Sequence, residues 1–208
     1  MPEILRKMIL DVLPDIWPII IIITVIVCTL RIAYLIKNKK RVCLYKELFH
    51  LMFILYVMCL FEIVTIQDIN YGTSNIIPFK EIFRYSFGSR LFIKNILGNI
   101  ILFMPYGYFV SYYLKSHKAL PICLLTIIVS TTIEIVQLKI GRTFDIDDII
   151  LNTCGGIIGY LLYSSITGIA SKLPKPFQND ELINFIVVLI VIIVILYIIN
   201  FNILTFIS

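Results

Sequence analysis

Residues 13–36 read LPDIWPIIIIITVIVCTLRIAYLI, a run in which Asp15 and Arg31 are the only charged side chains. About 20 apolar residues suffice for a helix to cross a bilayer, so this stretch predicts a membrane-spanning helix. Further apolar stretches of similar length occupy residues 47–66, 91–113, 119–138, 148–168 and 183–206. The sequence therefore predicts an all-α, polytopic integral membrane helical bundle with about six transmembrane helices, five being the alternative count.

The composition excludes several classes of protein. The chain has 208 residues, of which 60% are hydrophobic and 15% are charged, and its mean hydropathy is +0.97. A soluble domain has roughly 25% charged residues, so a soluble enzyme, a disordered chain and a small secreted domain are all excluded. The net charge is +5, but the Lys and Arg residues lie in short segments between the apolar runs. That distribution is typical of membrane topology, and we expect no nucleic-acid partner.

The chain divides into four parts. Residues 1–12 mix charged and apolar side chains, and we expect either a segment in the membrane interface or a frayed polar start. Residues 13–66 supply two transmembrane helices. Residues 67–168 form a core with three more, and residues 169–208 supply a connector and a last helix.

The short connecting segments indicate the orientation of the bundle. With the amino terminus outside, the inner segments carry nine Lys and Arg in 29 residues, against seven in 45 residues for the outer segments. The inner segments are 37–46, 114–118 and 169–182, and the outer segments are 1–12, 67–90 and 139–147. Because cytoplasmic loops are enriched in Lys and Arg, both termini are predicted to be extracytoplasmic.

Polar side chains within the predicted spans gather toward one end of the bundle. In this orientation they all lie within roughly 12 Å of the outer boundary, at 1.5 Å rise per residue. They are Glu62, Asn95, Asn99, Glu134, Gln137, Asp148 and Asn152. An acid in the hydrocarbon layer is costly unless it faces a cavity or a partner. We therefore expect these groups to face one another in a polar pocket that opens outward.

Helical spacing supports close packing beside this pocket. Asp148, Asn152, Gly155 and Gly159 are spaced by four, three and four residues, so they share one stripe of the fifth helix. A neighbouring helix can approach glycines closely. In the third helix, Pro105 removes a backbone donor and predicts a kink.

The connection 139–148 carries two cations and three acids in ten residues. It is either a solvated turn in which Asp147 or Asp148 caps the fifth helix, or part of the site. Asp145 and Asp148 are candidate ligands for a divalent cation, and we expect no other cofactor. Five scattered cysteines and two histidines give no zinc-site pattern.

Three segments together resemble the VanZ-like family of bacterial membrane proteins. They are NIIPF at 75–79, NILGNIILFMPYG at 95–107 and IEIVQ at 133–137, the last continuing through Arg142, Asp145, Asp148, Asn152, Gly155, Gly156 and Gly159. The resemblance covers roughly residues 75–163. It implies a protein of the bacterial plasma membrane whose presence lowers sensitivity to teicoplanin-like lipoglycopeptides. It supplies no catalytic residues. We predict structural roles for Pro105, Gly107, Gly155, Gly156 and Gly159.

A binding protein is the first of three functional hypotheses. Its outer pocket would bind the drug or a lipid headgroup and limit access of the drug to lipid-linked cell-wall precursors. Lys139 and Arg142 would hold phosphate, and four amides would donate hydrogen bonds. These amides belong to Asn95, Asn99, Gln137 and Asn152. Membrane lipids, a teicoplanin-like lipoglycopeptide and a lipid-linked precursor are the expected partners.

A membrane enzyme is the second hypothesis. Glu134 would act as general base on a lipid-linked envelope molecule, Asp145 and Asp148 would hold a divalent cation, and Arg142 would stabilise phosphate charge. The lack of a visible nucleophile with an adjacent base counts against it. A transporter is the third hypothesis. It fits less well, because the ionisable groups stay in one leaflet, whereas a substrate path would place some at the midplane.

Overall fold

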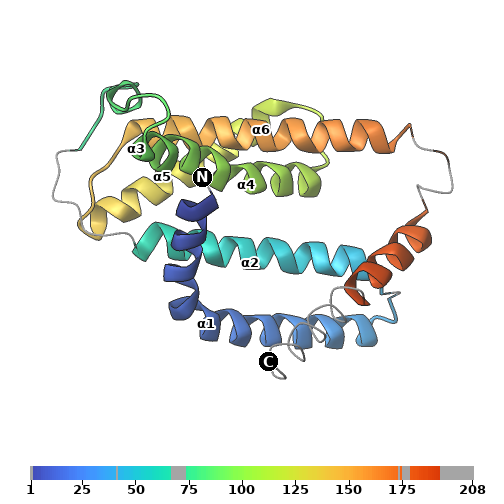
Figure 1. Ribbon diagram of the computed structural model, residues 1–208. Helices are drawn as coiled ribbons and strands as arrows, with labels where there is room; N and C mark the ends of the chain where they lie inside the picture. Colours follow the sequence, from blue (N-terminus) through green and yellow to red (C-terminus); the bar gives the residue numbers. More distant parts are fainter. Residues whose placement is uncertain (1, 41, 67–73, 173, 175–178, 193–208) are drawn as a thin grey trace, which may run out of the picture. The chain divides into compact units, whose positions relative to one another are not determined.

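The computed structural model confirms the predicted all-α fold (Figure 1). It describes the chain except for residues 1, 41, 67–73, 173, 175–178 and 193–208. The helices are α1 (Pro2–Lys37), α2 (Leu44–Ile66), α3 (Arg90–Phe92), α4 (Gly98–Leu114), α5 (Ala119–Lys139) and α6 (Ile146–Ala170), with further helical residues at 180–192. Within these described parts no strand forms, and Asn75 and Asp145 make an isolated backbone bridge.

Within the described residues, four helices are long and apolar enough to cross a membrane, and they match the first, second, fourth and fifth predicted spans. They are Trp17–Lys37, Leu44–Val64, Ala119–Lys139 and Ile146–Ala170. The chain is therefore a membrane protein. A third of the most apolar part of α6 is buried, so α6 packs against other helices over much of its length. The last predicted span, 183–206, lies largely outside the described residues.

The third predicted span, 91–113, is helical but not uniform. It is divided among α3, the π-helical segment η2 (Ile93–Leu97) and α4. The departure from α-helical geometry lies in η2. At Pro105 the chain remains in the α-helix α4. Pro105 lacks the N–H that would bond the Ile101 carbonyl, and the hydroxyl of Tyr56 donates to the next carbonyl, that of Leu102, at 2.8 Å.

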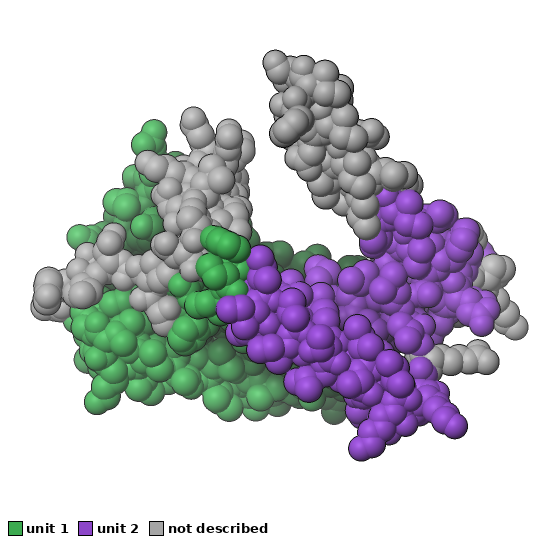
Figure 2. All heavy atoms as spheres, turned by 90° about the horizontal axis from the view of Figure 1, so that it is seen from below, with its two compact units in different colours: residues 1–19, 56–168 green, residues 20–55, 169–208 purple. Residues whose placement is uncertain are grey.

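The chain forms two compact units, coloured separately in Figure 2. Unit 1 comprises Met1–Ile19 and Tyr56–Gly168, and unit 2 comprises Ile20–Leu55 and Ile169–Ser208. The first division lies next to Pro18 inside α1, which begins at Pro2 rather than near residue 13 as predicted. All the candidate site residues belong to unit 1.

Polar contacts join the helices of unit 2. Arg31 of α1 and Glu47 of α2 form an ion pair at 2.6 Å. Asp180 accepts hydrogen bonds from the Tyr45 hydroxyl and the Lys46 ammonium, both near the start of α2. The side chain of Asn184 also accepts from the backbone N–H of Tyr45, at 3.3 Å. These contacts connect α2 both to α1 and to the helical residues 180–192.

Glycines allow α4 and α6 to lie in backbone contact within unit 1. A Cβ atom on Gly155 would lie 2.3 Å from the carbonyl oxygen of Ile100, and one on Gly159 would lie 2.1 Å from another carbonyl oxygen of α4. From the opposite side, a Cβ atom on Gly107 would lie 2.0 Å from the carbonyl oxygen of Gly156. Real Cβ atoms do not approach so closely, so each of these positions requires glycine for the observed packing.

The remaining helices of unit 1 pack on this pair. Gly156 also faces α5, where a Cβ atom would lie 2.4 Å from the hydroxyl oxygen of Thr126. Leu60 and Val64 in the second half of α2 pack with the buried Phe103 of α4. The glycine contacts and this apolar cluster bring the ends of α2, α4, α5 and α6 together.

We expect Gly155→Ala and Gly159→Ala each to destabilise the protein by about 1–3 kcal/mol, because the added methyl group must separate α4 from α6. Thermal unfolding of the detergent-solubilised protein measures the change. Gly168→Ala is the matched control, since a Cβ atom there meets nothing within 4 Å. Unchanged unfolding temperatures for all three variants would contradict the packing described.

Candidate functional site

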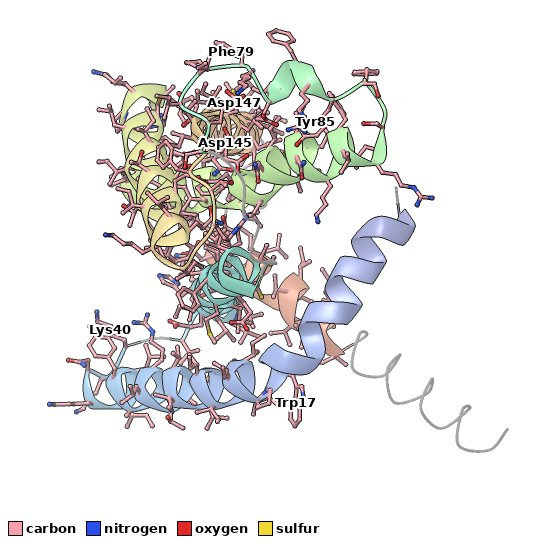
Figure 3. All side chains as sticks on the ribbon, turned by 90° about the vertical axis from the view of Figure 1, so that its left-hand side faces the viewer. Trp17, Lys40, Phe79, Tyr85, Asp145 and Asp147 are labelled. Carbon is pink, nitrogen blue, oxygen red and sulfur yellow. The ribbon has the colours of Figure 1, made fainter. Side chains whose placement is uncertain are left out.

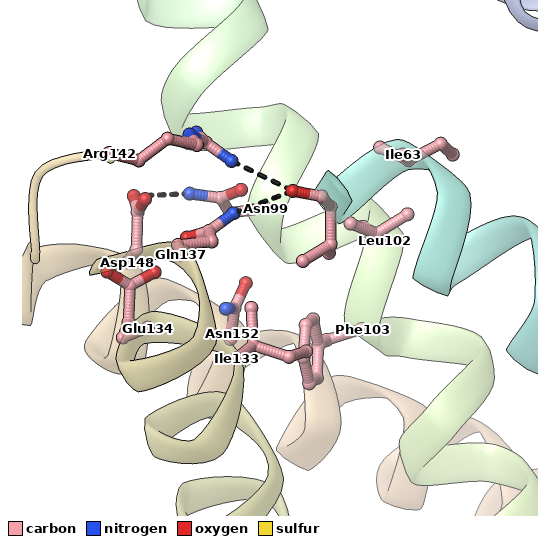
Figure 4. Close-up of a pocket in the computed structure, with 11 residues that line it drawn as sticks. Ile63, Asn99, Leu102, Phe103, Ile133, Glu134, Gln137, Arg142, Asp148 and Asn152 are labelled. Carbon is pink, nitrogen blue, oxygen red and sulfur yellow. Dashed lines mark hydrogen bonds between the residues drawn. The ribbon is translucent and has the colours of Figure 1, made fainter. Parts of the chain in front are cut away.

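A small pocket lies among α4, α5, α6 and the end of α2 (Figure 4). Its polar lining residues are Asn99, Glu134, Gln137, Arg142, Asp148 and Asn152. All six were singled out from the sequence as candidate site residues. The cavity volume is about 40 Å³, room for a few water molecules. A pocket of this size takes one small polar group rather than a sugar ring.

The polar face of α5 supplies one wall of the pocket. Glu134 and Gln137, three residues apart, are both buried, and Ser130 lies on the same stripe one turn earlier. One carboxylate oxygen of Glu134, Oε2, accepts the backbone N–H of Asp145 at 2.8 Å. Glu134 thereby binds the connection that links α5 to α6.

Arg142 and Gln137 both donate to the Val64 carbonyl oxygen, at 3.0 and 3.2 Å. Val64 lies in the last turn of α2, where carbonyl groups have no partner within the helix. The two side chains therefore satisfy the end of α2. Arg142 and Lys139 were predicted to bind a phosphate group. Arg142 instead donates to this backbone carbonyl, and Lys139 is not among the residues lining the pocket.

Asp148 brings a second carboxylate to the pocket. It accepts a hydrogen bond from the side-chain amide of Asn99 across the α4–α6 contact. Asp148 also interacts electrostatically with Glu134, Asp145 and Arg142. The lining thus contains two carboxylate groups against one guanidinium group.

Asn152 has an unpaired atom at the pocket. Its side chain is only 4% exposed, and its Nδ2 donates to the hydroxyl oxygen of Ser130 at 2.8 Å. Its Oδ1 is buried and has no hydrogen-bond partner in the described part of the chain. Figure 4 shows the Asn152 amide directed into the pocket. An unpaired buried acceptor costs about 1–3 kcal/mol, so this oxygen favours a ligand or a water molecule there.

Asp145 lies beside the pocket and caps α6. Its Oδ1 accepts the backbone N–H of Asp147 at 2.9 Å, two residues into the helix, and the side-chain amide of Asn75 at 2.9 Å. Burial raises the pKa of Asp145, and these two hydrogen bonds partly oppose that rise. Capping by Asp147 or Asp148, one of the two alternatives predicted for this connection, is wrong because α6 begins at Ile146.

Asp147 instead anchors the loop that precedes α3. It is 1% exposed and accepts backbone N–H groups from Phe79, Glu81 and Ile82. Phe79 has φ +67°, a left-handed conformation that a bulky side chain rarely adopts. Figure 3 shows Asp147 and Phe79 at the same end of unit 1. The connection 139–148 is therefore a loop anchor as well as part of the site.

Sequence reasoning did not identify Asn75, Asp147 or Ser130 as site residues. Asn75 holds the loop that precedes α3 to the start of α6 through backbone bonds with Phe144 and Ile146, at 2.8 and 3.0 Å. Its place in the quoted NIIPF segment was the available signal for its importance. Ser130 carried no signal beyond its position one turn before Glu134.

Two predicted roles are not matched by this arrangement. Asn95 lies in η2 and is not among the residues lining the pocket. Asp145 and Asp148 bond to different partners, and among the described residues no group of three or more His, Cys, Asp or Glu could hold a metal ion. The structure thus gives the suggested divalent cation no complete ligand set in the described parts of the chain.

We expect Asp147→Asn to weaken the loop more than Asp145→Asn does. An amide at 147 offers one acceptor oxygen to three backbone donors, whereas an amide oxygen at 145 can still accept both of its hydrogen bonds. The expected loss is about 2–3 kcal/mol at 147 and under about 1 kcal/mol at 145. Protease cleavage within residues 74–89 measures the difference, and equal cleavage rates would contradict it.

Comparison with known proteins agrees with the resemblance seen in the sequence. The family model for VanZ/LLP1 matches residues 47–168, more than half the chain. Protein VanZ of Enterococcus faecium is 32% identical over 106 residues, which are 50% of this chain. The match spans 63% of the length of that relative. No solved structure matches significantly. The chain belongs to the VanZ/LLP1 family.

Proposed function

We propose that this protein contributes to resistance against teicoplanin-type lipoglycopeptides in a bacterial plasma membrane, through a polar pocket that binds a lipid headgroup or part of the drug. Membership of the VanZ/LLP1 family and the similarity to protein VanZ support the resistance phenotype. The excess of Lys and Arg on one side supports an outward-facing pocket with both termini extracytoplasmic.

The convergence of Glu134, Asp148 and Asn152 on one cavity is the observation that carries this proposal. Carboxylate and amide groups are expensive in an apolar layer, and leucine would fill the same space without that cost. Groups kept at such a cost are typically functional. The small cavity favours a single headgroup-sized polar group over an entire antibiotic. Binding an envelope lipid would change the outer surface and so limit access of the drug to cell-wall precursors.

The alternative is an enzyme that modifies a lipid-linked envelope molecule. Glu134 would then act as general base toward a water molecule in the cavity, which has room for one. The pocket lining contains no Ser, Cys or His, so a carboxylate would have to do this chemistry. Mass spectrometry of lipids from cells with and without the protein separates the two functions, because only an enzyme produces a new lipid species.

We expect Glu134→Gln to remove teicoplanin protection while the protein still accumulates in the membrane. The change keeps the size of the side chain and removes its charge, so the loss would report the carboxylate rather than the packing. Arg142→Ala should also remove protection, because it leaves the Val64 carbonyl short of a donor beside the pocket. The measurement is growth inhibition by teicoplanin, with vancomycin in parallel and protein levels from immunoblots.

Glu81→Gln is the matched control for Glu134→Gln. Glu81 pairs with the exposed Arg84 at 3.0 Å outside the pocket, so this variant should protect as well as the wild type does. Full protection by both Glu134→Gln and Arg142→Ala at normal protein levels would show that the pocket residues are structural, and would overturn the proposal.

A further inference from the structure

The pocket presents unpaired hydrogen-bond acceptors. In the described part of the chain, Oδ1 of Asn152 has no partner. Glu134 uses Oε2 for the N–H of Asp145, and Asp148 uses Oδ1 for Asn99, which leaves the second oxygen of each carboxylate for the pocket. Three acceptors on two helices therefore line one small cavity.

Each donor side chain of the pocket makes a hydrogen bond within the protein. Asn99 donates to Asp148, and Gln137 and Arg142 both donate to the Val64 carbonyl. With two carboxylates and one guanidinium, the lining carries a net charge of −1 when its groups are ionised. A phosphate group needs donors and positive charge, so it fits this lining poorly. A cationic donor group has the opposite and complementary chemistry.

We propose that the pocket binds the primary ammonium group of an envelope lipid. Such a group carries one positive charge and three N–H donors, which match the three unpaired acceptors of Glu134, Asp148 and Asn152. It is compact enough for a cavity of about 40 Å³. This inference rests on the proposed function, in which the pocket is the functional centre, and it names the ligand class.

Methylation of the headgroup nitrogen provides the test. Ethanolamine, N-methylethanolamine, N,N-dimethylethanolamine and choline headgroups carry the same charge with three, two, one and no N–H donors. Short-chain phospholipids bearing these headgroups are titrated into the purified full-length protein in detergent, and binding is measured by calorimetry. Each added methyl group should weaken binding about tenfold, because it leaves one buried acceptor unpaired.

Two further ligands distinguish the sources of binding. If the ammonium group is recognised as part of a lipid, free ethanolamine should bind more weakly than the ethanolamine phospholipid. The pocket variants Asp148→Asn and Glu134→Gln should reduce the binding of both. Inorganic phosphate should not compete. Equal affinity for the ethanolamine and choline lipids, competition by phosphate, or no saturable binding of any probe would each overturn the inference.

Variants locate the binding in the pocket. Asp148→Asn and Glu134→Gln should each abolish the preference for ethanolamine over choline, because the lining loses its net negative charge. Asp180→Asn is the control for Asp148→Asn, since Asp180 pairs with Lys46 in unit 2 and is not among the residues that line the pocket. Retention of the preference in both pocket variants would overturn the inference. The methylation series uses the wild-type protein and does not depend on folding of any variant.

The outcome is separable from that of the resistance experiment. If Glu134→Gln removes teicoplanin protection but the methylation series is flat, the ammonium ligand is wrong and the proposed function stands. If the series shows the expected gradient but Glu134→Gln still protects, the pocket binds the ammonium group and the proposed role in resistance is wrong.

Discussion

Polar groups among apolar helices must find their partners within the chain, because the hydrocarbon of a bilayer offers none. This constraint explains the contacts around the pocket. The end of α2 leaves the Val64 carbonyl free, and two side chains from other elements satisfy it. The N–H of Asp145 is satisfied by Glu134, and three N–H groups of the loop that precedes α3 by Asp147. The site and the connections between the helices thus form one network of hydrogen bonds and electrostatic interactions.

That network depends on the close approach of α4 and α6. Asn99 reaches Asp148 across this interface, and the glycines at 155 and 159 set how near the two backbones lie. A larger residue there would move Asn99 away from its carboxylate partner. The glycines therefore contribute to the polar site without any polar atom of their own, by fixing the distance between helices that carry polar side chains.

Four of the six predicted spans match helices of the described chain, because the thickness of the bilayer sets the length of an apolar run. The gathering of Glu134, Gln137, Asp148 and Asn152 was also predictable, since their helical positions place them at one depth. Their partners were not. Arg142 bonds to a carbonyl at the end of α2, a choice that depends on where that helix ends. Asp145 caps α6 in place of Asp147 or Asp148 because the helix begins two or three residues before the expected boundary.

The hydrogen-bond partners of the lining residues also determine which ligand chemistry suits the pocket. Arginine in a site is commonly taken as a sign of phosphate binding, but a donor that already serves a backbone carbonyl is less available to a ligand. Here Asn99, Gln137 and Arg142 each donate a hydrogen bond within the protein, and Oδ1 of Asn152 is an acceptor without a partner in the described part of the chain. Under our two proposals, this member of the VanZ/LLP1 family uses a pocket suited to a cation with hydrogen-bond donors, and resistance would depend more on the amine content of the envelope than on its phosphate.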